Sequence, residues 1–486
     1  TINKGILMKN IIPQKFLISS LIIIVLTFIL LRVFAIISTP LELSADEAQY
    51  WLWSKELNWG YFSKPPMIAW LIHVSNNIFG DYDYSIRIFA PLIHGINALV
   101  IFRLSQEIND NYLAHFLSSL IWLTLPIVGV GSFLMSTDTP LMLIWTTSLL
   151  VIVKAYNSDN LFLWNLAGLI AGLALYAKYA ALYLPLGLII FYIINFQNEK
   201  NIKLRGLFLF VLNFVIVSLP NVIWNYFNNF HTINHLSSNA VIDAPSYSLF
   251  GSLTFLIAQV AILGPLLFIV FLLTAYNIKR LNKLSIFLLY FIFPVYILMF
   301  IQGFFSEANA NWAASALPAI TILCGYFLSK RIKFAVLTIF SNFFICIFIL
   351  IVSFNGNLIF LDLKSDPLRK LKGWNILSED LKDTISKKKS DVVLVDRRGI
   401  AAELIYYLRN ENIKIRVPES SKSPSNHYQL HYPLTDKENK IFYYASENTK
   451  IPESYKVDYN VVKVGVSDVQ ISKKKNRKIN IYLIEK

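Results

Sequence analysis

The residues with the clearest chemical potential follow the first hydrophobic segment. Asp46 and Glu47 are adjacent acids, and Lys64 comes directly before Pro65 and Pro66. A carboxylate can take the proton from an attacking hydroxyl, and a cation can stabilise a phosphate leaving group as its charge develops. Each proline fixes its own φ and restricts its predecessor, so Lys64 sits on a stiffened backbone. The pattern predicts group transfer from a phosphate-linked donor beside a membrane.

A helix over residues 45–57 would place several of these side chains together. Asp46, Gln49 and Tyr50 would share one face, because residues three and four apart are neighbours on a helix. Tyr61 follows in the same stretch, which also contains four tryptophans suited to the headgroup layer of a bilayer: Trp51, Trp53, Trp59 and Trp70. Two charges at the mouth of a span are costly and usually functional, although solvated loop acids remain an alternative.

Further polar residues flank later apolar segments: Asp138, Lys178, Tyr179 and Glu307. Lys178 offers a second cation for a phosphate. The modest alternatives are a helix N-cap for Asp138 and a snorkelling surface lysine for Lys64. His231 and His235 are four residues apart and would share a helix face, but no acid or cysteine lies near them, so they are weak evidence for a metal site.

The elements that position these residues are membrane spans. Of the 486 residues, 55% are hydrophobic and 15% charged, against about 25% charged in soluble proteins. The net charge of +14 fits the Lys and Arg excess of cytoplasmic loops better than nucleic-acid binding. Cys324 and Cys346 both lie in apolar runs and predict no disulfide framework.

About eleven apolar runs approach spanning length, at 16–37, 85–107, 112–131, 138–156, 161–177, 180–196, 206–224, 251–276, 284–302, 311–328 and 333–353. With eleven spans, four basic clusters fall on one side: 4–15, 200–205, 279–283 and 330–333. The loops at 132–137 and 225–250 on the other side contain no Lys or Arg. The positive-inside rule then predicts a cytoplasmic N-terminus, with the acidic stretch and the C-terminal tail outside.

The composition changes near residue 360. Short β-rich runs appear at 391–396, 441–446, 461–466 and 479–485, and an amphipathic helix is expected at 400–409. This order predicts a small basic α/β domain over 360–486, after a membrane module over 1–355 that includes an interfacial loop at 38–84. The basic surface would either be attracted to anionic headgroups or be simply solvated.

Taken in order, the segments DEAQYW, GYFSKPPMIAWL, MSTDTPLM, LYAKYAALYLP, LPNVIWN and EANANWAASALPA resemble the bacterial GT-C glycosyltransferase superfamily. The similarity is to the aminoarabinose and galacturonic-acid transferases of lipopolysaccharide, and to the protein O-mannosyltransferases that use dolichyl-phosphate mannose. In the tail, DPLRKLKGW and VDRRGIAAELIYYL are similar to the extracytoplasmic domain of the lipopolysaccharide branch.

The resemblance implies a polyprenyl-phosphate sugar donor used at the outer face of the bacterial inner membrane. It makes Asp46 the essential acid and Lys64 a contact of the donor phosphate, and Asp138 matches the Thr-Asp-x-Pro aspartate. Gln49 stands where aminoarabinose-type relatives often have arginine, and Ser63 where they have an acid. Those two departures remove a possible phosphate contact and a possible metal ligand. We therefore assign no metal, and a divalent cation stays an open alternative.

The expected partners are a polyprenyl-phosphate sugar, a glycolipid acceptor such as lipid A or lipopolysaccharide core, and the bilayer. Three other functions stay open: a flippase or transporter of lipid-linked sugars, a protein O-glycosyltransferase, and a non-catalytic assembly subunit. Transporters tend to place charges near mid-membrane within repeated, broken helices. Here the charges gather at one interface, and we detect no repeat in the sequence, which favours the enzyme.

Overall fold

The computed structural model describes residues 13–195, 201–240, 247–358, 366–386, 389–420, 423–449, 451–472 and 475–486. The chain divides into two compact units, each built from segments distant in sequence. Unit 1 comprises Thr1–Ile37, Lys64–Ile68 and Arg87–Ile351, and unit 2 comprises Ser38–Ser63, Ala69–Ile86 and Val352–Lys486.

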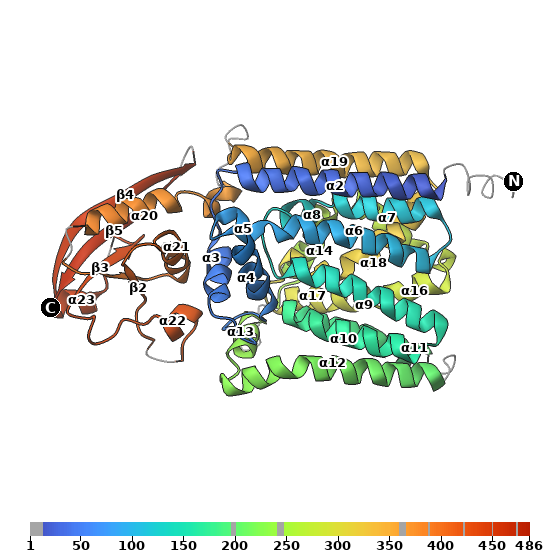
Figure 1. Ribbon diagram of the computed structural model, residues 1–486, viewed down its shortest axis with the longest axis horizontal. Helices are drawn as coiled ribbons and strands as arrows, with labels where there is room; N and C mark the ends of the chain where they lie inside the picture. Colours follow the sequence, from blue (N-terminus) through green and yellow to red (C-terminus); the bar gives the residue numbers. More distant parts are fainter. Residues whose placement is uncertain are drawn as a thin grey trace. The chain divides into compact units, whose positions relative to one another are not determined.

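Unit 1 is helical, and its long helices run side by side (Figure 1). Its elements are α2 (Gln14–Ser38), α6 (Phe89–Ile108), α7 (Tyr112–Thr124), α8 (Pro126–Gly131), α9 (Asp138–Ser158), α10 (Leu161–Ala177), η2 (Tyr179–Leu182), α11 (Tyr183–Asn195), α12 (Asn201–Phe227), α13 (His231–Ala240), α14 (Leu249–Leu263), α15 (Pro265–Tyr276), η4 (Ile278–Arg280), α16 (Lys283–Leu289), α17 (Phe293–Phe305), η5 (Ala310–Ala316), α18 (Leu317–Ser329) and α19 (Ile332–Asn355). One continuous apolar core joins most of them.

Close helix packing in unit 1 depends on small residues. Gly168 and Gly172 lie one turn apart on α10, and a Cβ at Gly168 would collide with the backbone of Phe210 on α12. Helices in membranes approach closely where small residues are spaced four apart, because packing rather than water exclusion holds them together. The same spacing therefore fixes α10 against α12.

Among the described residues, seven helices are long and apolar enough to span a membrane, or eight if the bent pair α14 and α15 counts as one. That pair bends by 114° at Gly264, whose φ of 85° favours glycine, just before Pro265. The predicted run 112–131 is split because Pro126 begins a new helix, which leaves α7 with 13 residues. Thirteen residues extend about 20 Å, less than the hydrocarbon core. The multi-pass fold is confirmed, whereas the number eleven is not.

Unit 2 contains a five-stranded sheet in the order β2-β1-β3-β5-β4. Its elements are α3 (Ala45–Ser54), η7 (Pro367–Leu371), α20 (Trp374–Ile385), β1 (Val392–Val395), α21 (Arg398–Tyr407), β2 (Lys414–Arg416), α22 (His427–His431), β3 (Ile441–Ser446), α23 (Glu453–Asp458), β4 (Asn460–Ser472) and β5 (Lys475–Glu485). β1 runs parallel to β2 and β3, and β5 runs antiparallel to β3 and β4. The predicted small α/β domain is confirmed.

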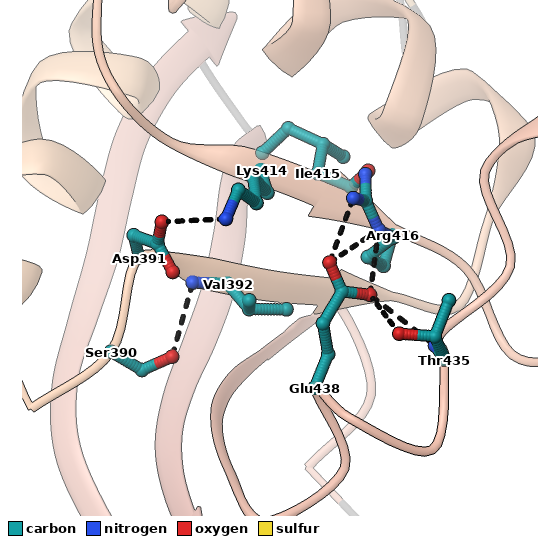
Figure 2. A network of polar contacts seen from close by, with 8 residues as sticks. All are labelled: Ser390, Asp391, Val392, Lys414, Ile415, Arg416, Thr435 and Glu438. Atoms are coloured by element: carbon teal, nitrogen blue, oxygen red, sulfur yellow. Dashed lines mark hydrogen bonds and ion pairs between the residues drawn. The ribbon is translucent and has the colours of Figure 1, made fainter.

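The interior strand β1 is buried at all four positions, as its unbroken apolar sequence predicts for a strand with a neighbour on each side. The three-residue strand β2 was not expected. Two ion pairs lie along it: Lys414 with Asp391 at 3.1 Å, and Arg416 with Glu438 at 2.8 Å (Figure 2). They connect β2 to the start of β1 and to the loop before β3.

The segments on both sides of Lys64, Ser38–Ser63 and Ala69–Ile86, pack into unit 2. The Glu42 carboxylate accepts hydrogen bonds from the backbone N–H groups of Trp374 and Asn375 at the start of α20. Asp83, on the short helix α5 (Asp83–Arg87), accepts hydrogen bonds from the hydroxyls of Tyr406 and Tyr407 on α21 at 2.7 and 3.0 Å. The loop that we expected to belong to the membrane module is thus tied to the C-terminal domain. That residues 1–355 form the catalytic module stays a prediction.

Candidate active site

The acidic pair begins helix α3, and its two members lie in different environments. The N-cap Ser44 accepts from the backbone N–H of Glu47, and the Glu47 carboxylate accepts from the backbone N–H of Ser44 at 3.0 Å. This reciprocal capping box fixes the start of the helix. Glu47 is buried in that role, whereas the Asp46 side chain is 60% exposed. Of the pair, Asp46 is the carboxylate that a substrate can reach.

Asp46 faces the start of α21. Its Oδ1 lies 3.3 Å from Nη1 of Arg398, the first residue of that helix. Both side chains are more than half exposed, so solvent screens the pair and it adds little to stability. The arginine instead keeps a positive charge beside the candidate base.

The predicted helix over 45–57 is confirmed, although it ends at Ser54. Tyr61 explains the end: its ring stacks on Trp53 with centroids 4.8 Å apart, and its hydroxyl donates to the carbonyls of Trp53 and Glu56. Burial raises the pKa of the Tyr61 hydroxyl to about 12, so it stays a donor. Gln49 and Tyr50 are also buried. The buried side chains of Gln49, Tyr50 and Tyr61 pack α3 into the interior of unit 2.

The placement in a headgroup belt was wrong for Trp51 and Trp53. Trp51 and Trp53 are 5% and 2% exposed, because Trp51 packs edge-on against Tyr406 of α21 and Trp53 lies between Tyr61 and His427. Trp59, at 49% exposure, is the member that reaches the surface most clearly.

A second cluster lies in unit 1, at the start of α9. Lys178 Nζ is 2.7 Å from Oδ1 of Asp138, and Nδ2 of Asn311 donates to Oδ2 of Asp138 at 2.9 Å. The side chains of Asp138 and Lys178 are 12% and 20% exposed. The N-cap position of α9 is Thr137, which makes no capping side-chain hydrogen bond. The Asp138 carboxylate therefore holds two side chains from distant elements instead of capping its own helix.

Tyr179 extends this cluster to α12. Its hydroxyl donates to Oδ1 of Asn221 at 2.8 Å and accepts from Nδ2 of Asn225 at 3.1 Å. Sequence reasoning missed Asn221, Asn225 and Asn311. The signal was present, since Asn221 and Asn225 lie four residues apart in a predicted apolar span, where amides need partners.

Lys64 belongs to the same unit as this cluster. It is half-buried in the loop before α4 (Met67–Phe79), and the two prolines after it are buried. Glu307 is exposed between α17 and η5. His231 and His235 do share helix α13. Within the described ranges, no three His, Cys, Asp or Glu side chains are grouped to hold a metal ion.

The candidate residues of the two clusters include carboxylate, cationic and amide groups. Such a set suits proton transfer and phosphate binding. Residues 63–224, which include Lys64, Asp138 and Lys178, match the family model for dolichyl-phosphate-mannose-protein mannosyltransferase. The chain is also 29% identical over 418 residues to the lipid A galacturonosyltransferase RgtD of Rhizobium johnstonii, covering 85% of this chain and 88% of that protein. These matches support a bacterial glycosyltransferase of the GT-C type that uses a lipid-linked sugar.

Two further comparisons agree with these matches. The undecaprenyl phosphate-alpha-4-amino-4-deoxy-L-arabinose arabinosyl transferase 2 of Proteus mirabilis is 28% identical over 254 residues, which cover 47% of this chain and 45% of that protein. The crystal structure of ArnT from Cupriavidus metallidurans bound to undecaprenyl phosphate has a TM-score of 0.70 at 13% identity, covering 96% of this chain and 98% of that one. The structural match shows that the chain has an ArnT-like fold.

Proposed function

We propose that the protein transfers a sugar from a polyprenyl-phosphate donor to a glycolipid acceptor, either lipid A or the core of lipopolysaccharide. The observation that carries this proposal is the match to the lipid A galacturonosyltransferase, which extends over most of both chains. The undecaprenyl-phosphate arabinosyl transferases among the relatives support the donor class.

In the proposed reaction, the Asp46 carboxylate takes the proton of an acceptor hydroxyl. The hydroxyl oxygen attacks the anomeric carbon, and the bond from that carbon to the donor phosphate breaks. Polyprenyl phosphate leaves with the bonding electron pair. The exposed side chain of Asp46 supports this role, because an acceptor must reach it directly.

Lys64 and Lys178 would bind the donor phosphate and stabilise the charge that develops on it. One Lys178 N–H already points to Asp138, and an ammonium group has two more to donate. Asp138 and Asn311 would then position Lys178. The remaining candidates, namely Glu47, Gln49, Tyr50, Tyr61, Tyr179 and Glu307, would shape the site without touching the reacting atoms.

For the location we propose the bacterial inner membrane, with the N-terminus in the cytoplasm and unit 2 in the periplasm. Support comes from the basic clusters at 279–283 and 330–333, which would face the cytoplasm. A donor anchored by its polyprenyl tail would then meet the acceptor at the outer surface.

The test uses the purified protein in detergent with lipid A and two probe donors, undecaprenyl-phosphate galacturonic acid and undecaprenyl-phosphate aminoarabinose. We expect mass spectrometry to show lipid A that has gained the mass of one sugar from one of the donors. In detergent there are no two compartments, so a flippase has no transport reaction to carry out. Unchanged lipid A with both donors, together with donor transport in vesicles, would therefore reject the transferase.

A further inference from the structure

A cavity of about 830 Å³ lies within unit 2, beside Asp46. Its walls come from the start of α3, from η7, from the start of α21 and from the beginning of β5. The volume lies within the range of pockets that hold a small ligand, and it exceeds the needs of one free phosphate ion. We call it the basic cavity, because seven arginine and lysine side chains line it against three carboxyl groups.

Part of this positive charge is compensated within the protein. Arg397 pairs with Glu447 at 2.5 Å, and Arg398 pairs with Asp46. Lys370 and Lys475 are exposed, and neither forms an ion pair with an acid among the described residues. Exposed like charges around one hollow repel each other, so an anion that binds among them gains from several cations at once.

Two buried side chains of the basic cavity have polar atoms without a hydrogen-bond partner among the described residues. Arg477 is 8% exposed, and its guanidinium carbon lies 3.4 Å from the centroid of the Trp374 ring. Its Nη2 donates to the carbonyl of Arg369, but its Nη1 has no partner among the described residues. Glu403 is fully buried, and neither of its carboxyl oxygens has a partner in that same set.

Unpaired buried polar groups are rare in folded proteins and call for an explanation. A phosphorylated sugar would provide one here: a phosphate oxygen accepts from Arg477 Nη1, and a sugar hydroxyl or a phosphate oxygen pairs with Glu403. Burial raises the pKa of the Glu403 carboxyl well above its ordinary value, against the opposing effect of Arg477, so its proton is available for such a bond.

We propose that the basic cavity binds a phosphate group of the glycolipid acceptor, which brings a hydroxyl of the same molecule to Asp46. This inference rests on the proposed function and adds to it, because it makes the acceptor's phosphate a requirement for recognition. Asp46 lies in the wall of the basic cavity, so a ligand bound to the cations there also faces the candidate base.

The experiment measures binding of lipid A to the full-length protein in nanodiscs made of uncharged lipid, without any donor. Three ligands are compared: phosphorylated lipid A, enzymatically dephosphorylated lipid A, and phosphatidylglycerol. The test variant is Lys370→Gln/Lys475→Gln, whose two side chains are exposed and should not affect folding. The control is Lys389→Gln/Lys414→Gln, which removes the same charge from two exposed lysines outside the cavity; Lys414 appears in Figure 2.

We expect the test variant to bind phosphorylated lipid A about tenfold more weakly or worse, while the control binds like wild type. Wild type should bind dephosphorylated lipid A as weakly as the test variant does. Equal binding of both lipid A forms by wild type would overturn the inference. Equally tight binding of phosphatidylglycerol would also overturn it, because the cavity would then recognise any lipid phosphate.

Turnover separates this inference from the proposed function. If wild type transfers sugar to both forms of lipid A with the same KM, the inference fails and the transferase stands. If wild type neither binds nor modifies lipid A, the proposed acceptor itself is wrong. An increase in the KM of the donor in the test variant, with acceptor binding unchanged, would assign the cavity to the donor phosphate and reject the inference.

Discussion

Lys178 and Asp138, forty residues apart in sequence, form an ion pair with 2.7 Å between Nζ and Oδ1. Both side chains are largely buried, and Asn311 donates a hydrogen bond to the second carboxylate oxygen of Asp138. A buried charge that loses its partner destabilises a protein strongly, whereas removing both partners costs less. The pair therefore has a structural role that can be measured apart from any role in phosphate binding.

A double-mutant cycle measures this structural role. We expect Lys178→Met alone to lower the free energy of unfolding by about 3 kcal/mol, since it leaves Asp138 buried and unpaired. Lys178→Met/Asp138→Asn should lose less than the sum of the two single variants. The measurement is thermal unfolding of the purified proteins in detergent. Strictly additive losses would show that the two charges do not interact.

The tryptophans of the acidic stretch should differ in their effect on stability. Trp53→Ala removes a ring that is 2% exposed and stacked on Tyr61, so we expect a loss of about 4 kcal/mol. Trp59→Ala removes a half-exposed ring whose aromatic partner is Trp70, and about 1 kcal/mol should be lost. Melting temperatures of the two variants in the same detergent give the comparison. A larger loss for Trp59→Ala than for Trp53→Ala would contradict the burial argument.

Glu403→Gln should change how stability depends on pH. Below the ordinary pKa of 4.5, the carboxyl is protonated in both the folded and the unfolded chain. Above it, the unfolded chain releases the proton while the buried folded carboxyl keeps it, so wild type loses stability as pH rises toward the raised folded pKa. The glutamine side chain has no proton that titrates in this pH range. The melting temperature of Glu403→Gln relative to wild type should be flat near pH 4 and rise toward pH 7; a difference independent of pH would contradict the burial effect.

Sequence reasoning was most successful where the structure is local. The helix that carries Asp46 and four of the strands follow from short repeating patterns of apolar residues. The Ser44–Glu47 capping box is local too, and Ser-x-x-Glu was there to be read. Its importance was missed because Glu47 was judged by its charge instead of its position three residues after a serine.

What the sequence could not provide are contacts between distant segments. Nothing near Trp51 predicts that α21, more than three hundred residues later, covers it. The partners of Asp138 come from two other elements. The predicted number of spans is not confirmed for a related reason, since Pro126 and Gly264 break apolar runs whose composition alone suggests continuous helices.

The central claim is that Asp46 is the base, and Asp46→Asn tests it most directly. Because Asp46 is exposed, the variant should fold like wild type. The control is Asp391→Asn, at an aspartate whose side chain is 41% exposed and paired with Lys414. Initial rates are measured for the purified proteins with the donor that wild type uses and lipid A. We predict that kcat falls at least about 100-fold in Asp46→Asn, with the control and both melting temperatures unchanged; a kcat of Asp46→Asn within about twofold of wild type would contradict the account.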